Sequence, residues 1–384
     1  MTGIVLRPKQ RCFMIRSIIE RGLIFAVASI AFFFIGYRYA MAEGLPSGWP
    51  WHGVTIVFPE GKPEDINLYK KKLGINVVRL QLQLRKYAFE KKVSPDKAWI
   101  DGMAWADHML DAGAQNSVVI ILNISEFPLD PNVPLNQTME KFWNDTEQRD
   151  GLVTIADRLS LHFHTRGKEL AAYDLMSEPV VIANDKSNAP KLWPMLLARI
   201  IHTIKKNDPQ RWIVVTPGPW GMPEGYRTFS PLSERKIIYN AHMYLPHAFT
   251  HQGIRSFPVG PTYPGRVRFY YWDINALRNS LQSLRNFGQK YKVPVLIGEF
   301  SAVRWATGGE PYIKDLASIF NEYGWSWLYH SGNGWHGWNP DYSDHYPGRD
   351  GATNWRNDYI GDQSLRWQTL REIFGVDQKK LSTP

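Results

Sequence analysis

Short apolar runs alternate with amphipathic stretches along most of the chain. From Val54 onward, this alternation is the pattern of a parallel sheet whose strands are joined by helices. The apolar runs predict eight strands, at 53–58, 75–82, 117–124, 170–176, 212–216, 236–244, 294–299 and 325–329. Helical periodicity predicts helices near 63–73, 98–113, 151–166, 191–206, 273–290, 310–323 and 363–374. Between Pro217 and Glu234 there is no helical period, and we expect a short or irregular turn there.

The connecting segments are unequal in length. Those that follow strands are long (126–150, 177–190, 217–235, 245–272 and 330–362), whereas those from helix to strand are mostly a few residues. In (β/α)8 enzymes the segments after the strands build the active face. We therefore predict a single-domain α/β fold, the (β/α)8 TIM barrel. An open doubly wound sheet is the alternative, but no Gly-rich phosphate loop follows the first strand.

Polar residues occur with a period of two near the ends of several predicted strands. Strands of a parallel barrel are buried on both faces, so polar residues inside them need a reason. Pro179 holds the preceding Glu178 in extended geometry, and Gly298 allows close approach beside Glu299. The strand-end residues that we expect to converge at the barrel mouth are Arg79, Asn123, Asp174, Glu178, Asn240, His242, Tyr244 and Glu299.

Five of these segments together resemble glycoside hydrolase family 5, the cellulase-like family of clan A. The sequence YDLMSEP at 173–179 is similar to the family's strand-4 motif, and IGEF at 297–300 is similar to its nucleophile motif. The segment at 74–80 resembles the strand-2 arginine segment, 242–244 the strand-6 His-x-Tyr, and Trp327 the strand-8 tryptophan. The resemblance covers roughly residues 50–375, and the ordered set is more specific than any single motif.

The resemblance implies that Glu178 is the general acid/base and Glu299 the nucleophile. It implies the following supporting roles: His242 and Tyr244 orient and polarise the nucleophile, Arg79 helps to hold its charge, and Trp327 is the platform under the sugar. Two positions depart from the family pattern. Ser177 replaces the asparagine before the acid/base, and Asn123 lies in a third-strand segment that lacks the family's histidine. These departures leave the chemistry in place and the substrate open.

Two carboxyl groups of different ionisation meet the needs of glycoside cleavage, because one delivers a proton and the other carries negative charge. We predict a retaining mechanism, with the carboxyl groups about 5 to 5.5 Å apart. The substrate that we expect is a β-linked polysaccharide or oligosaccharide. The other hypotheses are an exported glycan-binding protein without turnover, motivated by Ser177, and a transglycosylase of exopolysaccharide production.

Tryptophan is abundant in the segments that follow the strands. Indole rings stack on sugar faces, so these residues are candidate subsites, although we expect about half of them to pin loops to the barrel instead. The candidates are Trp143, Trp220, Trp305, Trp335, Trp338 and Trp355. The histidine and aspartate spacings match no metal motif, and we predict no metal and no cofactor.

The net charge of +9 is concentrated at the N-terminus. Residues 1–42 hold six Lys or Arg residues against Glu20, a net charge of +5, which leaves +4 for the remainder and argues against a nucleic-acid partner. The apolar run 23–36 and the Ala-Met-Ala sequence at 40–42 predict a cleaved signal peptide, with an uncleaved inner-membrane anchor as the alternative because Arg38 lies between them. The lone cysteine, Cys12, precedes this run.

We therefore expect three segments. Residues 1–42 form the signal peptide or anchor, 43–375 form the barrel, and 376–384 form a polar tail. The barrel, which lacks cysteine, is expected to be exported to the periplasm or the cell exterior and to act as a monomer.

Overall fold

The computed structural model describes residues 44–124, 142–183, 186–349 and 354–376. The predicted segment 1–42 and all but the first residue of the predicted tail 376–384 lie outside these ranges. One compact unit spans 45–230 and 237–384; the described part of the other consists of Gly44 and 231–236, which contain no helix or strand. Within the described ranges, every helix is too short or too polar to cross a membrane.

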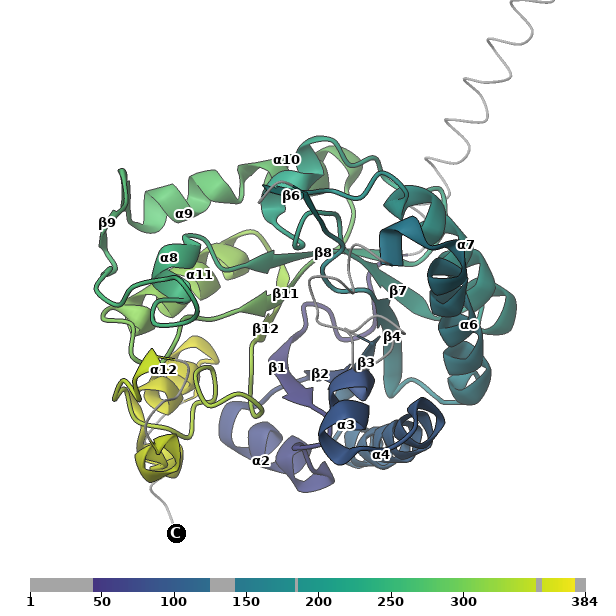
Figure 1. Cartoon of the computed structure of the whole chain (residues 1–384), viewed down its shortest axis with the longest axis horizontal. Coiled ribbons are helices and arrows are strands. Elements are labelled where there is room, and N and C mark those ends of the chain that lie inside the picture. Colours follow the sequence, from purple (N-terminus) through teal and green to yellow (C-terminus); the bar gives the residue numbers. More distant parts are fainter. Residues whose placement is uncertain (1–43, 125–141, 184–185, 350–353, 377–384) are drawn as a thin grey trace, which may run out of the picture. The chain divides into compact units, whose positions relative to one another are not determined.

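Eight parallel strands close into a barrel, which confirms the predicted fold. In chain order the strands are β1 (His52–Val57), β2 (Val77–Leu82), β3 (Val119–Ile124), β4 (Leu170–Leu175), β7 (Trp212–Val215), β8 (Ile237–Met243), β11 (Val295–Phe300) and β12 (Ser326–Tyr329). Neighbours follow chain order around the ring, and β12 pairs with β1 to close it. Figure 1 shows this ring surrounded by helices.

The helices are close to the predicted ones, with some differences in number and bounds. They are α2 (Pro63–Leu73), α3 (Leu84–Lys91), α4 (Pro95–Gln115), α6 (Thr146–Phe163), α7 (Trp193–Asn207), α8 (His247–Thr250), α9 (Ile274–Ser280), α10 (Gln282–Tyr291), α11 (Gly309–Glu322) and α12 (Leu365–Ile373). The helix predicted at 98–113 starts earlier because Ser94 caps it, and α3 precedes it. The helix predicted at 273–290 is two helices that meet at Leu281.

Short elements fill the long segments after the strands. The fifth crossover is a single 3-10 turn, η1 (Pro223–Arg227), as the absence of a helical period predicted. Two antiparallel hairpins, β5 (Val181–Ala183) with β6 (Lys186–Asn188) and β9 (Gly265–Val267) with β10 (Tyr270–Trp272), follow β4 and β8. Two further 3-10 turns, η3 (Trp355–Asp358) and η4 (Gly361–Gln363), precede α12.

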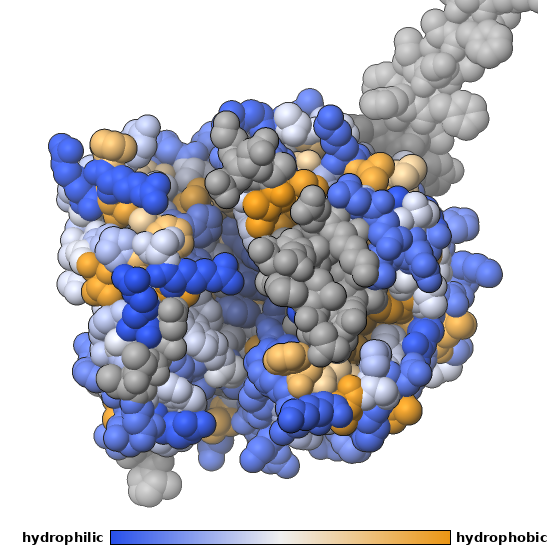
Figure 2. Space-filling model, viewed as in Figure 1, coloured by the Kyte–Doolittle hydropathy of each residue, from blue (hydrophilic) through white to orange (hydrophobic). Residues whose placement is uncertain are grey.

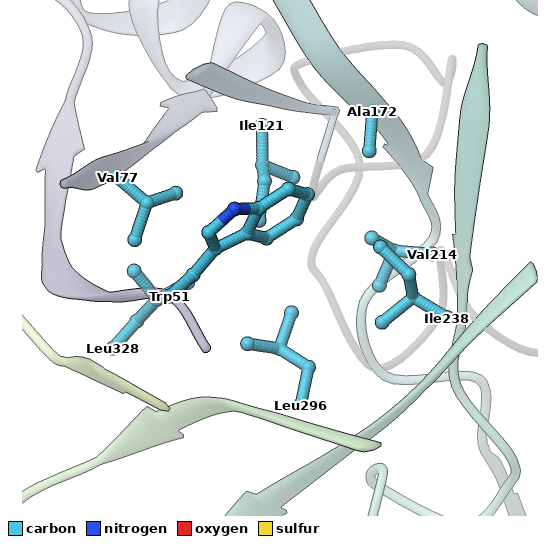
Figure 3. Packing of buried hydrophobic residues seen from close by; sticks show 8 residues of the cluster. All are labelled: Trp51, Val77, Ile121, Ala172, Val214, Ile238, Leu296 and Leu328. Carbon is cyan, nitrogen blue, oxygen red and sulfur yellow. The ribbon is translucent and has the colours of Figure 1, made fainter. Parts of the chain in front are cut away.

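The interior of the barrel contains an apolar layer centred on Trp51, the residue before β1. Figure 3 shows its indole ring surrounded by side chains from the other seven strands. The indole N–H donates to the Ser47 carbonyl (2.9 Å), and the ring is almost fully buried. The surrounding side chains are Val77, Ile121, Ala172, Val214, Ile238, Leu296 and Leu328. This layer seals the end of the barrel where the strands begin.

The next inward-facing layer is polar. Side chains alternate between the two faces of a strand, so residues two positions after the Trp51 layer also point into the barrel. These residues are Arg79, Asn123, Asp174 and Asn240, and all four are fully buried. The polar layer lies nearer the C-terminal ends of the strands, where barrel enzymes place their active sites.

Candidate active site

Arg79 on β2 connects three strands through its guanidinium group. Its Nε donates to Asp174 Oδ2 (2.8 Å), its Nη1 to Glu299 Oε1 (2.8 Å) and its Nη2 to Ser177 Oγ (2.6 Å). Burial would lower the pKa of Arg79, but the charges of Asp174 and Glu299 raise it above the ordinary value. A buried cation is thus balanced by two carboxylates.

A bulge in β11 turns Glu299 into the barrel. Leu296 faces the core, so strict alternation would point Glu299 outward. The pairing with β8 shifts between Ile297 and Glu299, however, which adds one residue at Gly298 and reverses the facing. A Cβ atom at Gly298 would lie 2.5 Å from Asn240 Oδ1, the atom that accepts the Gly298 N–H. Glycine at 298 therefore permits the turn of Glu299.

Glu299 is held as a carboxylate. Arg79 donates to Oε1, and the Tyr244 hydroxyl donates to Oε2 (3.1 Å). Burial alone would raise the pKa of Glu299, but the positive charges of His242 and Arg79 hold it well below the usual carboxyl range. Burial and the negative charge of Glu299 raise the pKa of Tyr244, so Tyr244 remains a hydroxyl donor. Arg79 and Tyr244 thus lie against the Glu299 carboxylate.

Glu178 follows β4 through an irregular backbone. Met176 has φ of 65°, a left-handed conformation that is rare for a non-glycine residue and that ends the strand. The Glu178 side chain is 36% exposed, whereas that of Glu299 is 8% exposed. The two glutamates that the sequence paired therefore meet at one site, one open to solvent and one enclosed.

His242 lies between the two carboxylates. Its Nδ1 is 2.8 Å from Glu178 Oε1, and its Nε2 is 3.8 Å from Glu299 Oε1. Burial would lower the pKa of His242, but the charges of Glu299 and Glu178 raise it. The expected partner of His242 was Glu299; the hydrogen-bonding distance is instead to Glu178. His242 thus couples the charge states of both groups.

Ser177 and Asn123 form the side of the site where the sequence departs from the family pattern. Asn123 Nδ2 donates to the Asp174 carbonyl (2.8 Å) and to Ser177 Oγ (2.9 Å). Ser177 Oγ also accepts from Arg79, so both of its lone pairs are used and its own proton is the group that it can donate. Asn123 and Arg79 together fix the position of the serine hydroxyl.

Trp327 does not belong to the site, which corrects the expectation of a sugar platform. Its neighbour Leu328 faces the barrel interior, so Trp327 points outward toward the helices. The indole is fully buried, donates to Asn321 Oδ1 (2.8 Å) and stacks on His52. A side chain enclosed in this way offers no face to a ligand.

The two glutamates open into a pocket of about 400 Å³. Its walls come from the ends of β8 and β11 and from the segments that follow β4, β7, β8 and β12, as the long post-strand segments predicted. Its lining residues are Glu178, Trp220, Met222, His242, Tyr244, His247, His251, Phe257, Glu299, His330 and Trp338. Of the six loop tryptophans, Trp220 and Trp338 line the pocket.

The other loop tryptophans serve mainly to hold loops. Trp143 donates to the Val180 carbonyl and Trp305 to the Gln252 carbonyl, while Trp355 stacks on His336. Trp335 is 38% exposed and packs edge-on against Trp338. The expectation that some of these residues pin loops is confirmed by these contacts.

Sequence reasoning missed the pocket histidines as wall residues. His330 lies directly after β12, and its Nδ1 is 3.7 Å from Glu299 Oε2; burial lowers its pKa. Burial also lowers the pKa of His251, to about 3, and the residue packs against Tyr244. Their positions in segments that directly follow strands could have identified these histidines as pocket residues from the sequence.

Among the described residues, one cluster of side chains has its potential ligand atoms close enough together to coordinate a metal ion. Glu178, His242 and Glu299 each offer a ligand atom, and these atoms lie within 4.8 Å of one another. The same three groups already interact through a hydrogen bond and charge, and they match the needs of acid–base chemistry. The residue set fits two catalytic carboxylates with a bridging imidazole.

Comparison with known families shows to which family the chain belongs. Residues 43–336 match the family described as Cellulase (glycosyl hydrolase family 5). The chain belongs to glycosyl hydrolase family 5. As a family 5 member it is a glycosidase that hydrolyses O-glycosyl bonds of a β-glycan, and the resemblance seen in its motifs is confirmed.

Individual family 5 relatives are distant. Endoglucanase C of Acetivibrio thermocellus is 22% identical over 256 residues, which cover 58% of this chain and 70% of that protein. A solved endoglucanase structure superposes with a TM-score of 0.62 at 19% identity, covering 88% of this chain and 99% of the other. The cellulose synthase subunit Z (CcsZ) of Clostridioides difficile superposes with a TM-score of 0.59 at 16% identity, covering 85% and 95%. Structural likeness at these identities shows the shared fold.

Proposed function

We propose that the protein is a retaining β-glycan hydrolase that cleaves by double displacement, with Glu178 as acid/base and Glu299 as nucleophile. The observation that carries the proposal is the contrast between two neighbouring carboxyl groups. Glu299 is enclosed and kept ionised by Arg79 and Tyr244, while Glu178 is open to the pocket. One oxygen of Glu178 lies within 4.8 Å of one oxygen of Glu299, and this closeness supports retention rather than the wider carboxyl spacing of inverting enzymes, about 6.5 to 9.5 Å.

In the first step, Glu178 donates its proton to the leaving glycosidic oxygen while a Glu299 oxygen bonds to the anomeric carbon. The bond to the leaving group breaks, and its electron pair takes the proton from Glu178. In the second step, Glu178, now ionised, accepts a proton from water. The water oxygen bonds to the anomeric carbon, and Glu299 leaves as a carboxylate with the electron pair of the broken ester bond.

His242 supports both steps through its place between the glutamates. When Glu178 has given up its proton, the imidazole at 2.8 Å stabilises the new carboxylate. When Glu299 is esterified, its negative charge is lost, and Arg79 remains balanced by Asp174. The electrostatic cost of alternating charge between the two glutamates is thereby reduced.

The substrate that we propose is a β-linked polysaccharide, cut by an endo-type, cellulase-like action. The pocket is open to solvent, and the rings of Trp220 and Trp338 give it apolar walls on which sugar faces stack. Two bacterial relatives of this chain carry the name endoglucanase, which supports the same substrate class. The basic and apolar N-terminal sequence supports export of the protein to a compartment that holds such polymers.

Chemical rescue with azide separates the two catalytic roles. The purified chain and its Glu178→Ala and Glu299→Ala variants would be assayed on an aryl β-cellobioside, whose leaving group needs no acid. In Glu178→Ala, azide should replace water in the second step and give a β-glycosyl azide. In Glu299→Ala, azide should replace the nucleophile and give an α-glycosyl azide. NMR of the products identifies each anomer.

Each variant should lose roughly 10²-fold to 10⁴-fold or more of kcat/KM on an unactivated β-glucan. Asp157→Ala, a change on the outer helix α6, is the matched control and should keep full activity. Near-normal activity of either glutamate variant would overturn its assignment. Glycosyl transfer to sugar acceptors in place of hydrolysis would identify a transglycosylase, and binding without turnover would identify a glycan-binding protein.

A further inference from the structure

The β9–β10 hairpin carries the most exposed large hydrophobic residue of the described ranges. It belongs to the segment between β8 and α9, and Figure 1 places it at the edge of the barrel beside α9, outside the ring of strands. Its tip residue Phe269 is 88% exposed, the highest value among the large hydrophobic residues of the described ranges. Tyr270 and Tyr271 follow at 71% and 60%. Three consecutive large aromatic residues therefore face solvent.

The base of this hairpin is firmly attached to the barrel. The Tyr263 hydroxyl donates to Asp315 Oδ2 on α11 (2.6 Å), and the Tyr263 N–H donates to the Thr307 carbonyl (3.1 Å). Val267 is buried, and the strands pair from Gly265 to Trp272. The exposure of the tip is thus a property of a fixed structural element.

The same tip is cationic. Arg266 and Arg268 are exposed, and neither forms an ion pair with another described residue. No Asp or Glu occurs between Ile237 and Trp272. Arg268 also adopts φ of 56°, where glycine would be less strained, so the turn keeps a charged residue at a conformational cost.

We propose that residues 266–271, the hairpin tip, bind the surface of a lipid bilayer that contains anionic phospholipids. Phenylalanine inserts at the boundary of headgroups and acyl chains, tyrosine and tryptophan rings sit at headgroup level, and arginine pairs with phosphate. The tip presents arginine, phenylalanine and tyrosine in one contiguous run. Each Arg near an anionic bilayer strengthens binding, and no Asp or Glu lies within the hairpin itself, residues 265–272.

A neutral β-glucan fits this surface less well. Such a polymer has no negative charge to pair with Arg266 and Arg268, and Phe269 has no polar group for sugar hydroxyls. Aromatic rings that stack on sugars line the pocket as Trp220 and Trp338 do, whereas the hairpin tip contributes nothing to the pocket. The tip therefore matches a membrane surface, and it acts independently of the reaction proposed above.

A fluorescent label placed on the full-length chain tests the proposal. Cys12→Ser removes the native cysteine, and Phe269→Cys provides one site for an environment-sensitive dye. Phe89→Cys on α3 is the matched control, because Phe89 is also exposed (59%). Both proteins are mixed with vesicles of phosphatidylcholine, with and without phosphatidylglycerol.

With phosphatidylglycerol vesicles, the emission maximum of the dye at position 269 should shift to shorter wavelength, and that of the dye at the control position should not. Added salt should weaken the effect, and Arg266→Ser with Arg268→Ser should reduce affinity by roughly tenfold or more. That double variant should keep full activity on a soluble oligosaccharide, because neither arginine lines the pocket.

Three results would overturn the proposal. The first is no shift at position 269, and the second is an equal shift at both labelled positions, which would assign binding to another part of the chain. The third is a larger shift with soluble alginate than with vesicles, which would make the partner an acidic polysaccharide. None of these results bears on the hydrolase activity, which the azide experiment tests separately.

Discussion

The two inner layers of the barrel come from the same strands, but burial has opposite energetic effects in them. In the Trp51 layer, apolar side chains surround one indole, and burial alone stabilises the arrangement. In the layer above, Arg79 is fully buried between Asp174 and Glu299, where removal from water opposes folding. Arg79 lies only two positions after Val77 on the same strand. Val77 nevertheless stabilises the fold, whereas Arg79 belongs to the site.

The layers also differ in how completely their polar atoms are paired. The Trp51 N–H has its acceptor at Ser47. Above it, Asn123 Oδ1, Asp174 Oδ1 and His242 Nε2 are buried without a hydrogen-bond partner in the described ranges. Unpaired buried polar atoms lower stability, so a layer that keeps them is organised for binding or catalysis. Figure 2 shows a hollow in the polar surface on the face viewed there.

Replacement of Arg79 by leucine should break the upper layer most strongly. Asp174 and Glu299 would be left buried without their counter-charge, so the free energy of unfolding should fall by about 3 to 5 kcal/mol. Because Glu299 would no longer be held ionised, kcat should fall at least about 10²-fold. Urea denaturation and β-glucan hydrolysis measure the two effects.

The double variant Arg79→Leu with Asp174→Asn is the control for charge. Removing one uncompensated carboxylate should restore part of the stability while leaving kcat low. If the double variant regained activity as well, the role of Arg79 in holding Glu299 would be wrong.

Trp51→Leu should weaken the lower layer without changing the chemistry. The smaller side chain leaves a cavity among the surrounding apolar residues, and we expect a loss of about 2 to 4 kcal/mol in the free energy of unfolding. At a temperature where the variant is fully folded, kcat should stay within about twofold of the wild type. A larger fall in kcat of the folded variant would show that the two layers are coupled.

The sequence predicted the ring of strands better than the site itself. Periodicity and strand-end polarity were enough to place Arg79, Asn123, His242 and Tyr244 at the barrel mouth, because these residues lie in regular strands or directly after one. The facing of Glu299 depends on a bulge, which no alternation pattern contains. Trp327 was misplaced because its role was carried over from a motif, while the alternation with Leu328 already pointed it outward.

Other parts of the site depend on long-range contacts that a sequence does not state. His330 reaches Glu299 because β12 closes the barrel beside β11, and Trp338 reaches the pocket through an irregular segment. The hydrogen bond from Arg79 to Ser177 joins residues 98 positions apart. Residue type and spacing indicate candidates for such contacts, but only the closed barrel brings the side chains together.

The smallest predicted effect is the pH dependence that Glu299 gives to stability. Its pKa in the folded protein lies below that in the unfolded chain, near 4.3. Its stabilising contribution is therefore present above that unfolded value and is lost as the pH falls toward the folded pKa. As the pH falls below about 4, the free energy of unfolding of the wild type should decrease more steeply than that of Glu299→Gln. The difference in slope should be at most roughly 1.4 kcal/mol per pH unit.

The two proteins are compared only at acidic pH because the contribution of His242 to stability changes with pH in the opposite direction to that of Glu299. Its raised pKa adds stability that is present below its unfolded value, near 6.5, and lost as the pH rises through the folded value. Below about pH 5, His242 of the wild type is protonated in both the folded and the unfolded state, so it adds no pH dependence to the wild-type curve there. Parallel wild-type and Glu299→Gln curves from pH 5 to 3, measured by urea denaturation, would mean that the upper layer does not hold Glu299 as a stabilised carboxylate.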